Sequence, residues 1–124
     1  MRTFLAVVVA GALGAACRYG LDGLVSSRSG GELPWGTLAV NLSGCLVIGF
    51  LSTMLTERFA VDPALRIGLT VGFVGSYTTF STLVLESTQL AQAGSWAVAL
   101  LNVVGSIVIG WLAVLAGAAL GRAV

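Results

Sequence analysis

Four apolar stretches follow one another along this chain, and each is long enough to cross a lipid bilayer as a helix. An α-helix needs about 20 apolar residues to span the hydrocarbon core. The stretches cover about residues 3–25, 33–56, 64–92 and 96–120, and the segments between them are short and polar. We therefore expect an all-α membrane protein in which residues 1–124 form a single four-span domain, with both termini on one side of the membrane.

The charge content supports a membrane protein. Only 9% of the residues are charged and 57% are hydrophobic, whereas a soluble domain carries about 25% charged residues. The net charge is +1, so no basic surface indicates a nucleic-acid partner. Histidine and lysine are both absent, which excludes imidazole general bases and histidine-ligated metals. Because the sequence shows neither a nucleophile–base pair nor a cofactor motif, we expect no enzymatic activity.

The first apolar stretch has features of a signal peptide, since an arginine precedes it and small residues follow. Apolar character resumes after Arg18, so we interpret the stretch as a retained first span, with a cleaved peptide or a lipoprotein anchor as the alternative. Cys17 and Cys45 lie in apolar stretches without metal-ligand spacing. We interpret both as small buried hydrophobic residues.

The arginines are divided between the two ends of the expected helices. One end receives Arg2, Arg58, Arg66 and Arg122, and the other receives Arg18 and Arg28. A bias this weak permits insertion in both orientations, although many small membrane proteins carry few charges for other reasons. Two small-xxx-small motifs, at residues 68–72 and 117–121, predict close helix packing within or between subunits.

Polar residues recur at helical spacing in two of the spans. The second span carries Thr37, Asn41, Gly44 and Ser52, and the fourth carries Asn102 and Ser106. Polar side chains that face lipid are costly, so both stripes should face protein or water. They either form hydrogen bonds between helices or line a permeation path. A chain of 124 residues has little room for a pore of its own, so we expect such a path at an oligomer interface.

The middle of the third span reads "GSYTTFSTLVLES", residues 75–87, and contains seven hydroxyl side chains and the carboxylate of Glu86. Glycines, β-branched residues and competing hydroxyls all weaken a helix. We therefore expect the third helix to be broken at mid-membrane, with a bent helix as the alternative. A break frees backbone carbonyls, which suit a hard cation such as Na⁺, and donors, which suit an anion.

Four segments of the chain resemble the signature regions of the Fluc, or CrcB-type, fluoride channels. They are "GALGAACRYG" (11–20), "WGTLAVNLSGCLVIGF" (35–50), "GFVGSYTTFSTLVLE" (72–86) and "NVVGSIVIG" (102–110), one in each span and in order. The resemblance implies passive fluoride export from the cytoplasm across the bacterial plasma (inner) membrane. It also implies an antiparallel, dual-topology homodimer with a structural Na⁺ at its centre.

The resemblance assigns roles to individual residues. It implies a fluoride pathway formed by Thr37, Asn41, Phe80, Ser81, Thr82 and Ser106. It implies that backbone carbonyls of Gly75 and Thr78 hold the Na⁺. Arg18 and Glu86 match an arginine and a carboxylate of the family pattern, to which we give structural or vestibule roles.

One position departs from the family pattern, because Leu83 stands where the family has a second phenylalanine. An aliphatic side chain lacks the electropositive ring edge that attracts an anion. We favour conduction at an altered rate; weak conduction, or pairing with a paralogous subunit, are the alternatives.

The main rival function is a small multidrug-resistance-type antiporter, which needs a carboxylate in its first span. Here that span has only Asp22, near its end. A non-transporting assembly subunit, the second rival, would not need two polar stripes.

Overall fold

In the computed structural model, all regular secondary structure among the described residues is helical. The structure describes residues 1–59 and 61–124, and every side chain among them except that of Arg58. The helical segments are α1 (Arg2–Ser26), α2 (Trp35–Thr53), η1 (Met54–Arg58), α3 (Pro63–Ile67), η2 (Gly68–Val74), α4 (Gly75–Tyr77), α5 (Phe80–Gln92) and α6 (Trp96–Ala123), where η marks π-helical geometry.

These segments form four long apolar helices, which confirms the predicted number of spans. The helices cover Arg2–Ser26, Trp35–Glu57, Pro63–Gln92 and Trp96–Ala123, and their ends lie within three residues of those expected from the sequence. The third helix starts with a capped first turn: the Asp62 carboxylate accepts a 2.9 Å hydrogen bond from the Ala64 amide, and Pro63 takes the first helical position. Gly31 lies in the turn between α1 and α2, and Gly94 lies in the turn between α5 and α6. Their φ angles of 95° and 89° are values that favour glycine.

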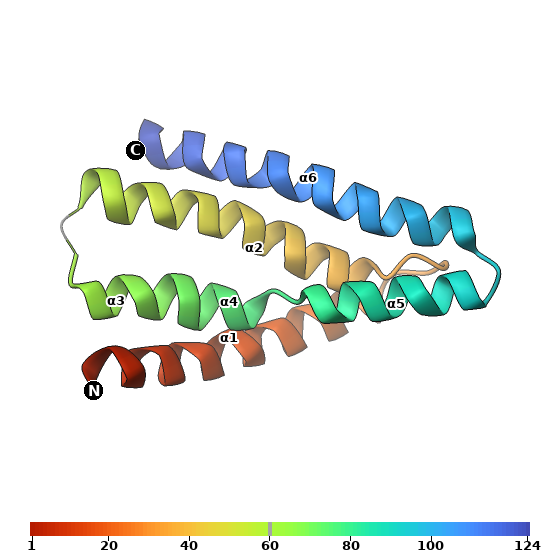
Figure 1. Ribbon diagram of the computed structural model, residues 1–124, viewed down its shortest axis with the longest axis horizontal. Coiled ribbons are helices and arrows are strands. Elements are labelled where there is room, and N and C mark those ends of the chain that lie inside the picture. Colours follow the sequence, from red (N-terminus) through yellow and green to blue (C-terminus); the bar gives the residue numbers. More distant parts are fainter. Residues whose placement is uncertain (60) are drawn as a thin grey trace.

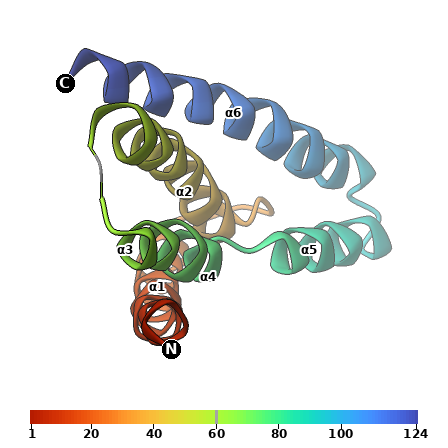
Figure 2. The same ribbon diagram turned by 60° about the vertical axis from the view of Figure 1, so that its left-hand side comes forward.

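The helices are arranged with α2 between α6 and the third helix, and with α1 packed on the far side of α3, η2 and α4 (Figure 1). In Figure 2, α5 lies apart from α3 and α4 and approaches α6. Both termini lie at the same end of the molecule, as four spans require (Figure 1). Two ion pairs hold the terminal residues at this end: Arg2 with Asp62, the N-cap of α3, at 3.4 Å, and Arg122 with Glu57, the last residue of the second span, at 3.3 Å.

Glycines allow these helices to approach closely. A Cβ atom added to Gly72 would lie 2.9 Å from the carbonyl oxygen of Val7 in α1. One added to Gly121 would lie 3.0 Å from the carbonyl oxygen of Phe50 in α2. Both distances are shorter than van der Waals contact, so a larger residue would force the backbone apart at Gly72 and would crowd it at Gly121. The two small-xxx-small motifs therefore pack helices within one subunit.

Two sequence-based expectations about burial are wrong. Cys17 is exposed on α1, and Cys45 is only partly buried. Ser52 was expected on the polar stripe of the second span, but it is exposed and donates its hydroxyl to the carbonyl of Ile48 in its own helix. Both errors concern the direction in which a residue on an apolar helix faces. Most large apolar side chains of α1 and α6 are likewise exposed, as expected for helices that contact lipid or another subunit.

Candidate functional site

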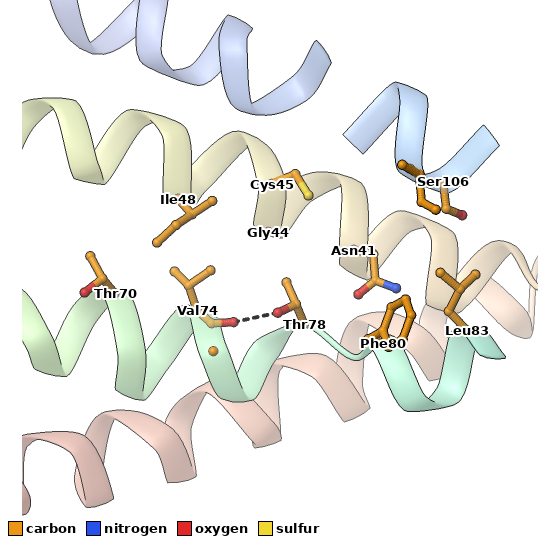
Figure 3. A pocket seen from close by; sticks show the side chains of 12 residues that line it. Asn41, Gly44, Cys45, Ile48, Thr70, Val74, Thr78, Phe80, Leu83 and Ser106 are labelled. Atoms are coloured by element: carbon orange, nitrogen blue, oxygen red, sulfur yellow. Dashed lines mark hydrogen bonds between the residues drawn. The ribbon is translucent and has the colours of Figure 1, made fainter. Parts of the chain in front are cut away.

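A pocket of about 350 Å³ lies between α2, the third helix and α6 (Figure 3). Five of the residues selected from the sequence line it: Asn41, Gly75, Thr78, Phe80 and Ser106. Leu83, the position that departs from the family pattern, also lines it. The pocket therefore gathers residues from all three of these helices at one place.

The pocket lies beside an interruption in the third helix. Thr78 (φ −81°, ψ 158°) and Thr79 (φ −148°, ψ 110°) have extended backbone geometry and separate α4 from α5. We call these two residues the Thr78–Thr79 segment. Helical geometry resumes at Phe80, because the hydroxyl oxygen of Thr79 caps α5 by accepting a 3.3 Å hydrogen bond from the amide of Thr82.

Asn41 is bonded to this segment through both ends of its carboxamide. Its Nδ2 donates a 3.0 Å hydrogen bond to the carbonyl oxygen of Thr79, and its Oδ1 accepts a 2.8 Å hydrogen bond from the amide of Thr79. Thr79 itself is buried. Sequence reasoning did not select Thr79, although its place inside the hydroxyl-rich run of the third span was a signal that could have identified it.

At the Thr78–Thr79 segment, two backbone amides do not form their usual helical hydrogen bonds. In a continuous α-helix the amide of Thr79 would donate to the carbonyl of Gly75, and the amide of Thr82 to the carbonyl of Thr78. Here these amides donate to Asn41 and to the Thr79 hydroxyl. The carbonyl oxygens of Gly75 and Thr78 thus lose their helical donors, and such oxygens are ligands that suit a hard cation.

Ser81 and Thr82, two predicted pathway residues, lie at the start of α5 and not in the lining of the pocket. The hydroxyl of Thr82 is 2.8 Å from that of Thr79, and the hydroxyl of Ser81 is 3.4 Å from it. The three hydroxyls form a cluster beside the pocket. Phe80, between Thr79 and Ser81, is 71% exposed, so its ring projects from the surface of the single subunit.

Thr37 and Glu86 form a second polar contact, one turn of α2 away from Asn41. The Thr37 hydroxyl donates a 2.9 Å hydrogen bond to Oε1 of Glu86, and Thr37 is only 1% exposed. Oε2 of Glu86 is buried and has no hydrogen-bond partner within the described residues. Glu86 also borders a separate pocket beside Glu32 and Gln89.

The two polar residues of α6 face protein, as expected from their spacing. Asn102 is 2% exposed and Ser106 is 8% exposed. Nδ2 of Asn102 donates a 3.0 Å hydrogen bond to the hydroxyl of Ser87, which in turn donates to the carbonyl of Leu83 at 2.7 Å. Oδ1 of Asn102 and the hydroxyl of Ser106 are buried without a partner in the part of the chain that the structure describes.

Arg18 is another predicted residue that does not line this pocket. It is half-buried on α1, which packs mainly against α3, η2 and α4 and also contacts α2. The Arg18 side chain therefore does not contribute to the walls of the pocket that holds Asn41 and Phe80.

Comparison with known proteins gives matches over nearly the whole chain. The family described as CrcB-like protein, Camphor Resistance (CrcB), matches residues 5–118. Three relatives carry the name "Fluoride-specific ion channel FluC". The one from Magnetococcus marinus is 44% identical over 94% of each chain. The one from Solibacter usitatus is 42% identical over 96% of this chain and 98% of its own.

The third relative, from Maridesulfovibrio salexigens, is 38% identical over 98% of this chain and 97% of its own. The match thus includes all four apolar helices, the Thr78–Thr79 segment and the residues of the pocket. The chain belongs to the CrcB-like protein family.

Proposed function

We propose that this chain forms a fluoride-selective channel that lets fluoride leave the bacterial cytoplasm by passive diffusion and so limits fluoride toxicity. One observation carries the proposal. Asn41, Phe80 and Ser106 line a single pocket, in a chain that matches channels named as fluoride-specific from end to end. The activity is transport across a membrane and not catalysis. Four apolar helices make the chain a multi-pass membrane protein, which we assign to the bacterial inner membrane.

The proposed fluoride pathway uses neutral groups. Asn41 has a second Nδ2 hydrogen, besides the one donated to Thr79, that could serve an anion. Ser106 offers a buried hydroxyl without a protein partner within the described residues. The ring edge of Phe80 is weakly electropositive. We extend the pathway to the hydroxyls of Ser81 and Thr82 beside the pocket, and to Thr37, one helical turn from Asn41. Selection by hydrogen-bond donors favours fluoride, which is the strongest hydrogen-bond acceptor among the halides.

We further propose a structural Na⁺ held by the backbone carbonyls of Gly75 and Thr78. The donor set fits such an ion, because both oxygens have lost their helical amide donors and carbonyl oxygen is a ligand that Na⁺ accepts. The ion would supply a fixed positive charge next to the pocket. In this proposal the Thr78–Thr79 segment lies near the middle of the bilayer.

The proposed assembly is an antiparallel homodimer with subunits inserted in both orientations. Its support is the weak arginine bias between the two ends of the helices, four against two, and the resemblance to dual-topology channels. The exposed ring of Phe80 and the pocket beside it would then face the partner copy. The remaining apolar faces would contact lipid. A paralogous subunit in place of the second copy is the alternative, motivated by Leu83.

The rival antiporter function is disfavoured by the position of the carboxylates. Asp22, the acidic residue of the first span, lies near the end of α1 and accepts a 3.0 Å hydrogen bond from Ser26. Glu86 lies on α5 and bonds to Thr37. We also assign Glu86 and Arg18 structural or vestibule roles and not direct anion binding.

A growth experiment tests the proposed function in cells. A bacterium that lacks its own fluoride exporter should regain growth in fluoride-containing medium when it expresses this chain. The Asn41→Asp variant, produced at the same level in the membrane fraction, should restore little growth. If the chain is present in the membrane and the cells remain as sensitive as those without it, fluoride export is not its function.

A further inference from the structure

Three neighbouring residues of α2 contact the three residues at the interruption of the third helix, one each. The hydroxyl of Ser43 is 2.7 Å from the phenolic oxygen of Tyr77, within hydrogen-bond distance. Gly44 lies against the methyl group of Thr78, which a Cβ atom at position 44 would overlap. Asn41 bonds to both the amide and the carbonyl of Thr79. One turn of α2 therefore defines the positions of residues 77, 78 and 79.

The Asn41 contact has a specific consequence for the backbone. A buried amide that loses its helical acceptor costs free energy unless another acceptor replaces it. Thr79 is buried, and Oδ1 of Asn41 is the acceptor that its amide uses. Without this oxygen, the amide of Thr79 loses its acceptor, and the segment around it opens more easily to water. The interruption between α4 and α5 then loses the contact that holds it in place.

We propose that Asn41 is a positioning residue that keeps the third helix interrupted at Thr79. Its carboxamide takes the place of a helical hydrogen-bond partner for the Thr79 peptide group and thereby leaves the carbonyl of Gly75 without its helical donor. The interruption also determines where α5 begins, and hence where Phe80 projects beside the pocket. This role is separate from donating a hydrogen bond to a passing anion, which would use the second Nδ2 hydrogen.

Hydrogen–deuterium exchange distinguishes the two roles, because it reports on the Thr79 amide without any fluoride. In the purified full-length protein, Asn41→Leu removes the acceptor, and Asn41→Ser withdraws it, because the serine oxygen lies one bond nearer the backbone than Oδ1. We expect exchange at the amide of Thr79 to become roughly tenfold faster in both variants, as is typical when a buried hydrogen bond is lost. Should the leucine variant fail to fold, the smaller serine side chain provides the same test.

Two comparison variants sharpen the result. Asn41→Asp retains an oxygen that can accept from the Thr79 amide but lacks the donor to the Thr79 carbonyl, so exchange there should rise less than in Asn41→Leu. Ser106→Ala changes a different wall of the same pocket and should leave exchange at Thr79 unchanged. The proposal is overturned if folded Asn41→Ser protein exchanges at Thr79 as slowly as the wild type.

The effect of this positioning on ion flux rests on the proposed channel function, whereas the exchange measurement does not. If Asn41→Ser speeds exchange at Thr79 and the wild type conducts no fluoride, the positioning role stands and the channel proposal fails. If the wild type conducts fluoride and exchange at Thr79 is unaffected by Asn41→Ser, the channel proposal stands and the positioning role fails.

Discussion

The hydroxyl of Thr37 donates a 2.9 Å hydrogen bond to Oε1 of Glu86 and so connects α2 to α5 across 49 residues of sequence. Thr37 is fully enclosed, and the other carboxylate oxygen of Glu86 is buried without a partner within the described residues. Glu86 is half-buried, so its carboxylate depends on the few donors that reach it. We therefore expect this contact to contribute to stability.

Removing the Thr37 hydroxyl should destabilise the protein. Thr37→Val keeps the side-chain shape and deletes the donor, so we expect a loss of about 1–3 kcal/mol in the free energy of unfolding. Thr37→Ser keeps the hydroxyl and is the matched control. Thermal unfolding of the detergent-purified protein measures the difference. Equal unfolding temperatures for the valine and serine variants would show that the hydrogen bond does not contribute to stability.

A negative charge at Asn41 should nearly abolish fluoride flux. Asn41→Asp places a carboxylate in the wall of the pocket, and repulsion of roughly 4 kcal/mol at 4 Å would slow an anion at least 100-fold. Fluoride efflux from liposomes, followed with an ion-selective electrode, measures the rate. Gln92→Glu makes the same amide-to-acid change at an exposed position at the end of α5 and should conduct normally. Wild-type flux in Asn41→Asp would remove Asn41 from the pathway.

The leucine at position 83 is the feature that separates this chain from the family pattern. Leu83 is only 4% exposed and lines the pocket with Phe80. Leu83→Phe restores an aromatic edge that attracts anions, so fluoride flux should be preserved or rise by a few-fold, roughly the effect of 1 kcal/mol. Leu83→Met changes the shape of the side chain without adding a ring. It therefore separates the effect of side-chain shape on flux from the effect of the aromatic edge. A large drop in flux for the phenylalanine variant would mean that the pocket has repacked around leucine.

Sodium should stabilise the folded protein if it binds the carbonyls of Gly75 and Thr78. Replacing Na⁺ with a large organic cation at constant ionic strength should lower the unfolding temperature, because a ligand that binds only the folded state adds about 2.7 kcal/mol at 100 times its dissociation constant. Chloride and fluoride concentrations are held constant in both buffers. An unfolding temperature that does not depend on Na⁺ would argue against the site.

The sequence alone was sufficient to predict the four helices, because each must bury about 20 residues in hydrocarbon and hydropathy records that requirement directly. The resemblance selected Asn41, Phe80, Thr78 and Gly75, and it is the structure that brings these four residues to one pocket. The sequence could not predict that Asn41 pairs with Thr79, since that contact joins residues 38 positions apart through one rotamer. It was wrong about Cys17 because α1 is apolar on all faces, and such a helix carries no periodic signal for its orientation.

The measurement that tests the account most directly compares fluoride and chloride efflux from the same preparation of liposomes containing the purified protein. The potassium ionophore valinomycin collapses the membrane potential, and no proton gradient is imposed, so the experiment reports passive anion movement. The account predicts that fluoride leaves faster than chloride by orders of magnitude, and that protein-free liposomes retain both anions. Equal efflux of the two anions, or fluoride efflux that requires a proton gradient, would contradict a fluoride-selective channel.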